Sequence, residues 1–372
     1  MNWTSLFKRV SLIAFNIAAS LVLVELVLRF IYTPPVLEIR LRMNALATQH
    51  AARSASQFDH EKMRFVPNSA RDMHHVEYEL STAHDALGFR NPCLEKLDAG
   101  TQELFLGDSF VYGIGLSDRF TYGCQLIENG LSAYSLGVPG ADMAKYLDVL
   151  RANGAAVKRR FPAMRRVNLV VFLGNDFESL RDYSSYRDMP EQASGDGKNG
   201  LLKLLGGPNR ALVTNPYLNK SYALNAAKLL LRPILAPSER KDYVVNFAGS
   251  SFYKKGVTRP VEALVDSLRL VDEQIGDLGF SLHGVYLIED PAALSEAKLQ
   301  KEMLVAGADH QQIDTRFKFE AVLTACKMLS LKCVDTSIAL SAEDYYTHDN
   351  HLKDAGAARL ARFIAQQKVE EK

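Results

Sequence analysis

The chain has 372 residues and a formal net charge of +1, so it is long enough for one large domain or two ordinary ones. Hydrophobic residues make up 47% and charged residues 23%, which is ordinary for a globular protein and excludes a disordered or collagen-like chain. The balanced charge excludes an overall field that would attract nucleic acid, and the four cysteines are too few for a disulfide scaffold.

A long apolar segment near the N-terminus, residues 10–32, predicts a transmembrane helix that follows a short tail of residues 1–9. As a helix rising ~1.5 Å per residue it would be about 34 Å long, which is enough for a single pass. Glu25 and Arg29 interrupt the segment four positions apart, so they can pair on one face of the helix. A cleaved signal peptide is the alternative interpretation, but the apolar run continues without a break past its small residues.

The orientation of this anchor is predicted from the basic residues around it. Lys8 and Arg9 favour a cytoplasmic N-terminus, although Arg40 and Arg42 on the far side nearly cancel that bias. The tail before the anchor is too short to hold a domain. We therefore expect a single-pass protein of the cell membrane whose folded domain lies outside the cytoplasm, in the periplasm.

Residues 33–85 show little periodicity and few strand signals, so we expect a stalk and a peripheral extension there. The segment contains four of the nine histidines, including the adjacent pair His74 and His75. No cluster of carboxylates or cysteines surrounds this pair in the sequence. We therefore expect surface histidines rather than a metal site.

From residue 101 onward, short strand-like runs alternate with longer helical patterns, which predicts a parallel sheet with helices on both faces. The expected strands are residues 103–106, 133–136, 167–173, 282–288 and 333–335. The expected helices are residues 121–130, 142–157, 260–277, 314–329 and 353–368.

An insertion, residues 181–258, interrupts this alternation. Because it follows the end of a strand, we expect it to lie over the ligand site of the sheet. Its basic residues are expected to form a solvated face, with contact to an anionic substrate or a lipid as the alternative. These residues are Lys203, Lys220, Lys228, Arg232 and Lys241.

Three short motifs follow three of the expected strands. Ser109 stands in Gly-Asp-Ser-Phe, where a tight turn into a helix would expose its hydroxyl at the edge of the sheet. Gly140 ends Gly-Val-Pro-Gly, where the backbone can approach a ligand closely enough to donate to an oxyanion. Asn175 lies in Gly-Asn-Asp, and a side-chain amide at a strand end is a suitable second donor. Each motif alone is also typical of an ordinary turn.

A fourth motif, Asp349-Asn350-His351, precedes the last expected helix. His351 can act as general base to Ser109, and Asp349 can accept a hydrogen bond from the other ring nitrogen. His348 is the competing base, while Asp344 and Asp354 are the alternative acids. We prefer His351 because it lies closer to the helix and has an acid two residues before it.

The cysteines add little to these predictions. Cys326 and Cys333 are seven positions apart and can form a disulfide only if their Cα atoms come within about 7 Å. We expect Cys93 and Cys124 to be buried thiols.

Together the four motifs resemble the SGNH hydrolase superfamily, also called GDSL-type esterases. The resemblance maps its four named residues to Ser109, Gly140, Asn175 and His351. It covers the predicted domain of residues 86–372, and the Glu25–Arg29 pair looks like a feature of membrane-anchored members. The spacing in the last motif and the insertion depart from minimal members, and the insertion leaves the substrate undetermined.

This resemblance implies a three-layer α/β/α sandwich around a parallel, flavodoxin-like sheet. It implies a Ser109–His351–Asp349 triad and an oxyanion hole formed by the Ser109 N–H, Gly140 N–H and Asn175 side chain, with no metal or other cofactor. The implied activity is that of a membrane-anchored serine hydrolase that cleaves esters of lipids or O-acyl groups of envelope glycans. An acyltransferase that modifies a surface polysaccharide, or a catalytically silent envelope protein, is the alternative. No nucleic-acid partner is expected.

Overall fold

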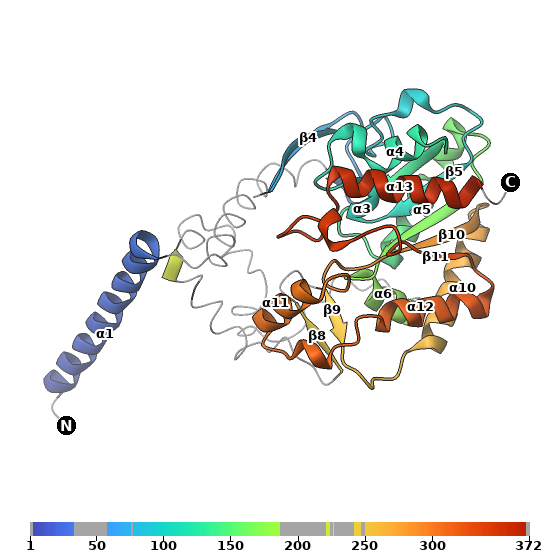
Figure 1. Cartoon of the computed structure of the whole chain (residues 1–372). Coiled ribbons are helices and arrows are strands. Elements are labelled where there is room, and N and C mark those ends of the chain that lie inside the picture. The colour runs from blue at the N-terminus through green and yellow to red at the C-terminus, as the bar shows by residue number, and fades with distance from the viewer. Residues whose placement is uncertain are drawn as a thin grey trace. The chain divides into compact units, whose positions relative to one another are not determined.

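The computed structural model divides the chain into two compact units, residues 1–55 with 196–237, and residues 56–195 with 238–372 (Figure 1). Most of the predicted insertion, including its five basic residues, lies outside the described residues, as does the stalk over residues 33–57. The structure describes residues 3–32, 58–75, 77–186, 221–223, 226, 242–246 and 250–369.

The first unit contains the N-terminal helix α1 (Trp3–Leu26), which passes into a π-helical turn at Val27–Ile31. As the spacing predicts, Arg29 pairs with Glu25, at 2.9 Å. Glu25 also accepts hydrogen bonds from the Ser221 hydroxyl at 3.0 Å and the Ala223 N–H at 2.7 Å.

The boundaries of α1 differ from the predicted transmembrane segment, residues 10–32. The α-helix begins at Trp3, before Lys8 and Arg9, and gives way to π geometry after Leu26. In the part of the chain that the structure describes, no helix is long and apolar enough to cross a membrane. The predicted transmembrane helix is thus not confirmed.

The second unit is built on a five-stranded parallel sheet, which confirms the predicted α/β class (Figure 1). In order across the sheet, the strands are β11 (Cys333–Asp335), β10 (Ser281–Ile288), β7 (Arg166–Phe172), β5 (Glu103–Gly107) and β6 (Ala133–Gly137). Numbered along the chain this order reads 2-1-3-4-5 from β6, which is the doubly wound order of flavodoxin. The order reverses between β5 and β7, and ligands of such sheets bind at that point.

Helices cover both faces of the sheet because consecutive side chains of each strand point to opposite sides. Leu104 and Leu106 of β5 join one core cluster, while Phe105 joins the other. The first cluster contains buried side chains from four helices: α5 (Met143–Arg160), α6 (Asp176–Tyr186), α10 (Val261–Asp277) and α12 (Phe317–Leu329). The second includes α3 (Ser109–Tyr112), α4 (Tyr122–Glu128) and α13 (Asp354–Val369).

The N-terminal extension contains four strands, so the expectation of few strands there is wrong for residues 58–83. The strands pair as two antiparallel hairpins: β1 (Phe58–Asp59) with β2 (Arg64–Phe65), and β3 (Ala70–His74) with β4 (Glu79–Ala83). Each strand of the second hairpin has only one buried side chain, Met73 or Thr82. That leaves too few apolar residues for a recognisable strand pattern.

The predicted insertion also has different boundaries, because α6 continues through residue 181 and a hairpin forms before residue 258. This hairpin pairs β8 (Tyr243–Val245) with β9 (Ser251–Tyr253). One further α-helix, α11 (Glu296–Ala306), follows β10. Short 3-10 helices lie at Leu94–Lys96, Asp118–Phe120, His310–Gln312 and Ala342–Asp344.

All four cysteines form disulfides. Cys326 pairs with Cys333, whose Cα atoms are 6.0 Å apart and therefore within the predicted limit. Cys93 pairs with Cys124, at a Cα separation of 5.3 Å, so the prediction of two buried thiols is wrong. The thiols meet because the turn after Phe89 brings Cys93 against α4, a contact between residues 31 positions apart.

Candidate active site

The predicted nucleophile, Ser109, is the first residue of α3 and lies at the carboxyl edge of β5. Asp108 caps this helix, because its carboxylate accepts the N–H of Phe110 at 2.9 Å. The end of the neighbouring strand β6 packs tightly against the turn: a Cβ on Gly137 would lie 2.2 Å from the backbone nitrogen of Tyr112. The cap and this close packing fix the backbone of the turn that carries Ser109.

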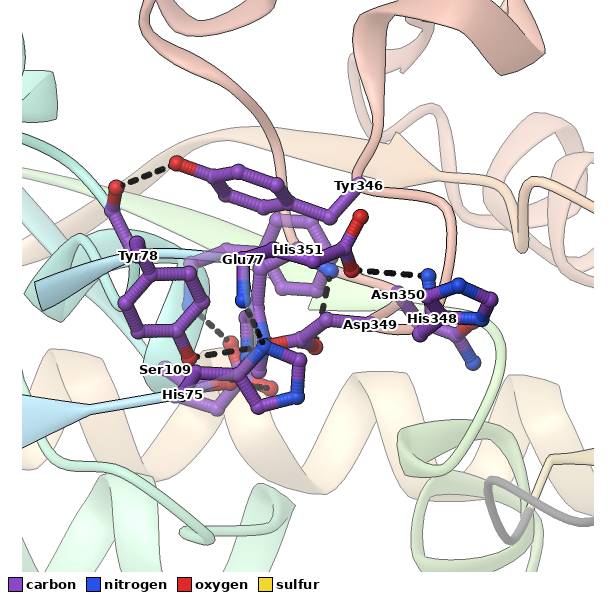
Figure 2. A network of polar contacts seen from close by, with 12 residues as sticks. His75, Glu77, Tyr78, Ser109, Tyr346, His348, Asp349, Asn350 and His351 are labelled. Atoms are coloured by element: carbon purple, nitrogen blue, oxygen red, sulfur yellow. Dashed lines mark hydrogen bonds and ion pairs between the residues drawn. The ribbon is translucent and has the colours of Figure 1, made fainter. Parts of the chain in front are cut away.

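The structure brings Ser109, His351 and Asp349 into one chain of hydrogen bonds (Figure 2). The Ser109 Oγ lies 2.7 Å from the Nε2 of His351, and the Nδ1 of His351 lies 2.5 Å from the Oδ1 of Asp349. With Asp349 ionised, Nδ1 donates its proton to the carboxylate and Nε2 accepts from the hydroxyl. A histidine in this arrangement can take the serine proton.

The charge of Asp349 is maintained by its hydrogen bonds. Burial alone would raise the pKa of this carboxyl, but the hydrogen bond and charge of His351 and the Tyr78 hydrogen bond hold its pKa below the usual range. Tyr78 donates to Oδ2 at 2.8 Å, and the backbone N–H of His351 donates to Oδ1 at 3.2 Å. Asp349 therefore stays ionised and can stabilise the imidazolium formed when His351 takes a proton.

The competing residues make other contacts. His348 is exposed, and its backbone N–H is bound by the carboxylate of Glu77 at 2.8 Å. Asp344 accepts the Ser341 N–H within a 3-10 capping box. Asp354 accepts the hydroxyl of Ser117 at 2.7 Å.

The three predicted oxyanion donors come from the ends of three adjacent strands. Ser109 follows β5, Gly140 follows β6 and Asn175 follows β7, and β5 lies between the other two strands. Gly140 has a φ of +72°, a conformation that glycine adopts without strain, and a Cβ there would meet nothing within 4 Å. The Asn175 side chain is exposed at the same edge of the sheet.

The His74–His75 pair is only partly explained by the expectation of surface histidines. His74 bonds Glu79 at 2.8 Å on the hairpin, but His75 is half-buried beside the site, with its ring stacked on Tyr78 at 4.9 Å. Burial lowers the pKa of His75, against the opposing charge of Asp349. Among the described residues no group of three or more histidine, cysteine, aspartate and glutamate side chains could hold a metal ion.

A buried polar network, which the sequence reasoning missed, supports the loops that carry Asn175 and His351. Asp290 accepts hydrogen bonds from the hydroxyl of Ser250 at 2.6 Å and the amide of Asn350 at 3.0 Å. Lys318 donates to the carbonyls of Leu173 and Gly174, at 2.5 and 3.2 Å. Burial lowers the pKa of Lys318 to about 8, although neighbouring acids, Asp290 first, raise it.

Comparison with known proteins gives matches among solved structures only. No protein-family model and no curated protein matches the chain. An aryl esterase from M. smegmatis matches at 11% identity, over 73% of this chain and 99% of that chain, with a TM-score of 0.34. Est24, a carbohydrate acetylesterase from Sinorhizobium meliloti, matches at 10% identity over 73% and 99%, with a TM-score of 0.36. A candidate SGNH hydrolase from Slackia heliotrinireducens matches at 12% over 72% and 99%, with a TM-score of 0.38.

Proposed function

We propose that the protein is a serine hydrolase that cleaves carboxylic esters through an acyl-enzyme on Ser109. One observation carries the proposal: the chain of hydrogen bonds from Ser109 through His351 to Asp349, at 2.7 and 2.5 Å. Ser109 meets the Asp349–His351 segment from 242 positions away, and the three side chains stand in the order that a nucleophile, a general base and an orienting acid require.

In the proposed reaction, the Nε2 of His351 takes the hydroxyl proton as the Oγ of Ser109 attacks the ester carbonyl carbon. The N–H groups of Ser109 and Gly140 and the amide of Asn175 donate to the resulting oxyanion. When the tetrahedral intermediate collapses, the alcohol leaves with the proton from His351 and the acyl group stays on Ser109. A water molecule, deprotonated by His351, then attacks the acyl carbon of the acyl-enzyme. When this second intermediate collapses, the Ser109–acyl bond breaks, His351 returns the proton to the Oγ of Ser109, and the acid leaves.

The test is hydrolysis of p-nitrophenyl esters of increasing chain length by the full chain in detergent. Active wild-type protein should be labelled at Ser109 by a serine-directed phosphonate, and Ser109→Ala should lose both hydrolysis and labelling while keeping its thermal midpoint within a few degrees. Labelling of another serine would refute the assignment. Transfer of the acyl group to an added glycan in preference to water would replace hydrolase by acyltransferase.

We further propose that the protein is held at a membrane through α1, with its catalytic unit outside the cytoplasm and lipid esters or O-acyl groups of envelope glycans as substrates. Disulfides persist in oxidising compartments, and this chain contains two. Large apolar side chains of α1 are exposed, among them Leu12 at 61% and Phe15 at 69%, and exposed apolar surface of this kind favours contact with lipid.

Fractionation of cells tests this location separately from the chemistry. The full chain should stay in the membrane pellet after a carbonate wash, and an alkaline phosphatase fused to its C-terminus should be active. Release by carbonate would refute attachment through α1. An inactive phosphatase beside a fluorescent cytoplasmic reporter at the same site would reverse the orientation and exclude envelope glycans as substrates.

A further inference from the structure

The turn between β3 and β4 packs against the loop that carries His351 and Asp349, although the two segments are about 270 positions apart. The carboxylate of Glu77 accepts the backbone N–H groups of Thr347 and His348, each at 2.8 Å. This pair of bonds fixes the backbone directly before Asp349 (Figure 2).

Tyr78, the next residue of the turn, reaches Asp349 itself. Its hydroxyl lies 2.8 Å from Oδ2, the carboxylate oxygen that His351 does not use. Burial, followed by the charge of Asp349, raises the pKa of Tyr78, so the phenol stays protonated and donates.

The ring of Tyr78 is held in place by close neighbours. It stacks on His75 at 4.9 Å and lies 5.0 Å from the ring of Tyr346. A Cβ on Gly115 would lie 3.2 Å from the ring, so the backbone approaches closely on that side as well. With its ring fixed, Tyr78 holds Oδ2 while His351 holds Oδ1, and the carboxylate cannot rotate away from the histidine without losing a hydrogen bond.

The hydroxyl is not needed to form the hairpin. The turn is closed by its backbone, since the His75 N–H donates to the Tyr78 carbonyl at 2.8 Å. The apolar packing of the extension is provided by the cluster of Phe65, Met73 and Tyr112, and the Tyr78 side chain packs against it. Replacing Tyr78 by phenylalanine keeps the aromatic ring for this packing and removes only the hydroxyl. The Tyr78 hydroxyl therefore contributes chiefly to Asp349.

We propose that Tyr78 is a positioning residue of the triad and that the β3–β4 turn, part of the N-terminal extension, completes the active site. This inference rests on the proposed function. Tyr78 touches neither the serine nor the reacting ester, and it acts by holding Asp349 in the orientation that His351 requires.

The test compares Tyr78→Phe with wild-type protein, using the full chain in detergent. We expect kcat to fall about 10-fold with KM nearly unchanged, the size expected for a lost hydrogen bond to a charged group. The carboxylate that loses this donor becomes a stronger acceptor for the imidazolium, so the acid limb of the kcat/KM profile should move to higher pH. The titratable groups that interact with Asp349 are Tyr78, His351, His75, Tyr346 and Lys298, and all but Tyr78 are the same in both proteins.

Tyr134→Phe is a matched control, because the buried Tyr134 hydroxyl donates to a carboxylate oxygen of Asp85 at 2.7 Å, and neither residue belongs to the triad. It should lower the thermal midpoint without moving the acid limb. A double-mutant cycle separates positioning from folding: in Asp349→Asn protein, removing the Tyr78 hydroxyl should cost less than about 2-fold in kcat, because its effect acts through the carboxylate.

Two results would overturn this inference and leave the proposed function intact. One is an active wild-type protein whose Tyr78→Phe variant matches it in kcat and pH profile. The other is a double-mutant cycle in which the losses of kcat from Tyr78→Phe and Asp349→Asn are fully additive. If wild-type protein neither hydrolyses esters nor is labelled at Ser109, the proposed function fails and the inference fails with it. Labelling at Ser109 is expressed per mole of folded protein, and the folded fraction is taken from the amplitude of cooperative thermal unfolding. This normalisation distinguishes these outcomes from misfolding of the variant.

Discussion

Glu289, which directly follows β10, makes the stability of the catalytic unit depend on pH. Its side chain is 4% exposed, and its Oε1 has no hydrogen-bond partner within the described structure. Burial raises the pKa of this carboxyl from 4.5 to about 7, against the lowering effect of Lys318 and Arg316. At 1.36 kcal/mol for each pKa unit, ionising Glu289 in the folded protein costs about 3 kcal/mol more than in the unfolded chain.

Because the pKa is raised by folding, the stability that Glu289 contributes is fully present below pH 4.5 and is lost as the pH rises to about 7. Glu289→Gln removes this titration. We therefore expect the free energy of unfolding of the variant, relative to wild type, to rise by about 3 kcal/mol between pH 4.5 and 7.5. Urea unfolding followed by circular dichroism at several pH values in this window measures the difference.

Thr324→Ala, which removes an exposed hydroxyl on α12 and no titratable group, is the control and should leave the difference from wild type nearly constant over the same pH range. The reasoning is refuted if Glu289→Gln also tracks wild type across this window, or if its relative stability falls as the pH rises.

Three further variants test the site and its scaffold. Replacing Cys93 and Cys124 by serine opens a link between residues 31 positions apart and should cost about 4 kcal/mol in the free energy of unfolding, measured in urea. Gly137→Ala places a Cβ 2.2 Å from the Tyr112 backbone nitrogen, so it should prevent the native β6–α3 contact and sharply lower the thermal midpoint. His351→Ala removes the proposed base and should lower kcat for ester hydrolysis by roughly 10⁴-fold or more.

Matched controls accompany these three changes. Serine at Cys326 and Cys333, which are only seven positions apart, should cost about 2 kcal/mol, and an equal or larger cost would contradict the loop-length argument. Gly276→Ala in α10 meets nothing within 4 Å and should not destabilise the fold. His348→Ala should retain activity, and a loss as large as that of His351→Ala would remove the reason for preferring His351.

The parallel sheet could be predicted from the sequence because its strands are buried on both faces. Every residue of β5 and of β6 is buried, so each strand reads as a short run of residues without exposed polar positions. The β3–β4 hairpin gave no such signal, since its strands are mostly polar and half-exposed. The pattern of polar and apolar residues along a strand reflects which side chains are buried. A strand that buries one residue in five therefore has almost no recognisable pattern.

The candidate site was predictable only in part for a related reason. Ser109, Gly140 and Asn175 each follow a predicted strand, so the parallel order alone brings them to one edge of the sheet. The contact of Tyr78 with Asp349 joins residues 271 positions apart, and nothing in the local sequence of either residue indicates it. Contacts of this kind depend on how the extension packs on the sheet, which the sequence of one chain does not reveal.

His351, the proposed base, lies 242 positions after Ser109 along the chain. At roughly 5–20 residues per second, the ribosome makes the serine on the order of 10–50 s before it makes the histidine. During that interval the nucleophile has no base, and the tyrosine that precedes both has no carboxylate to hold. Under the proposed mechanism, a nascent chain therefore carries Ser109 without its base until nearly all of the catalytic unit has been synthesised.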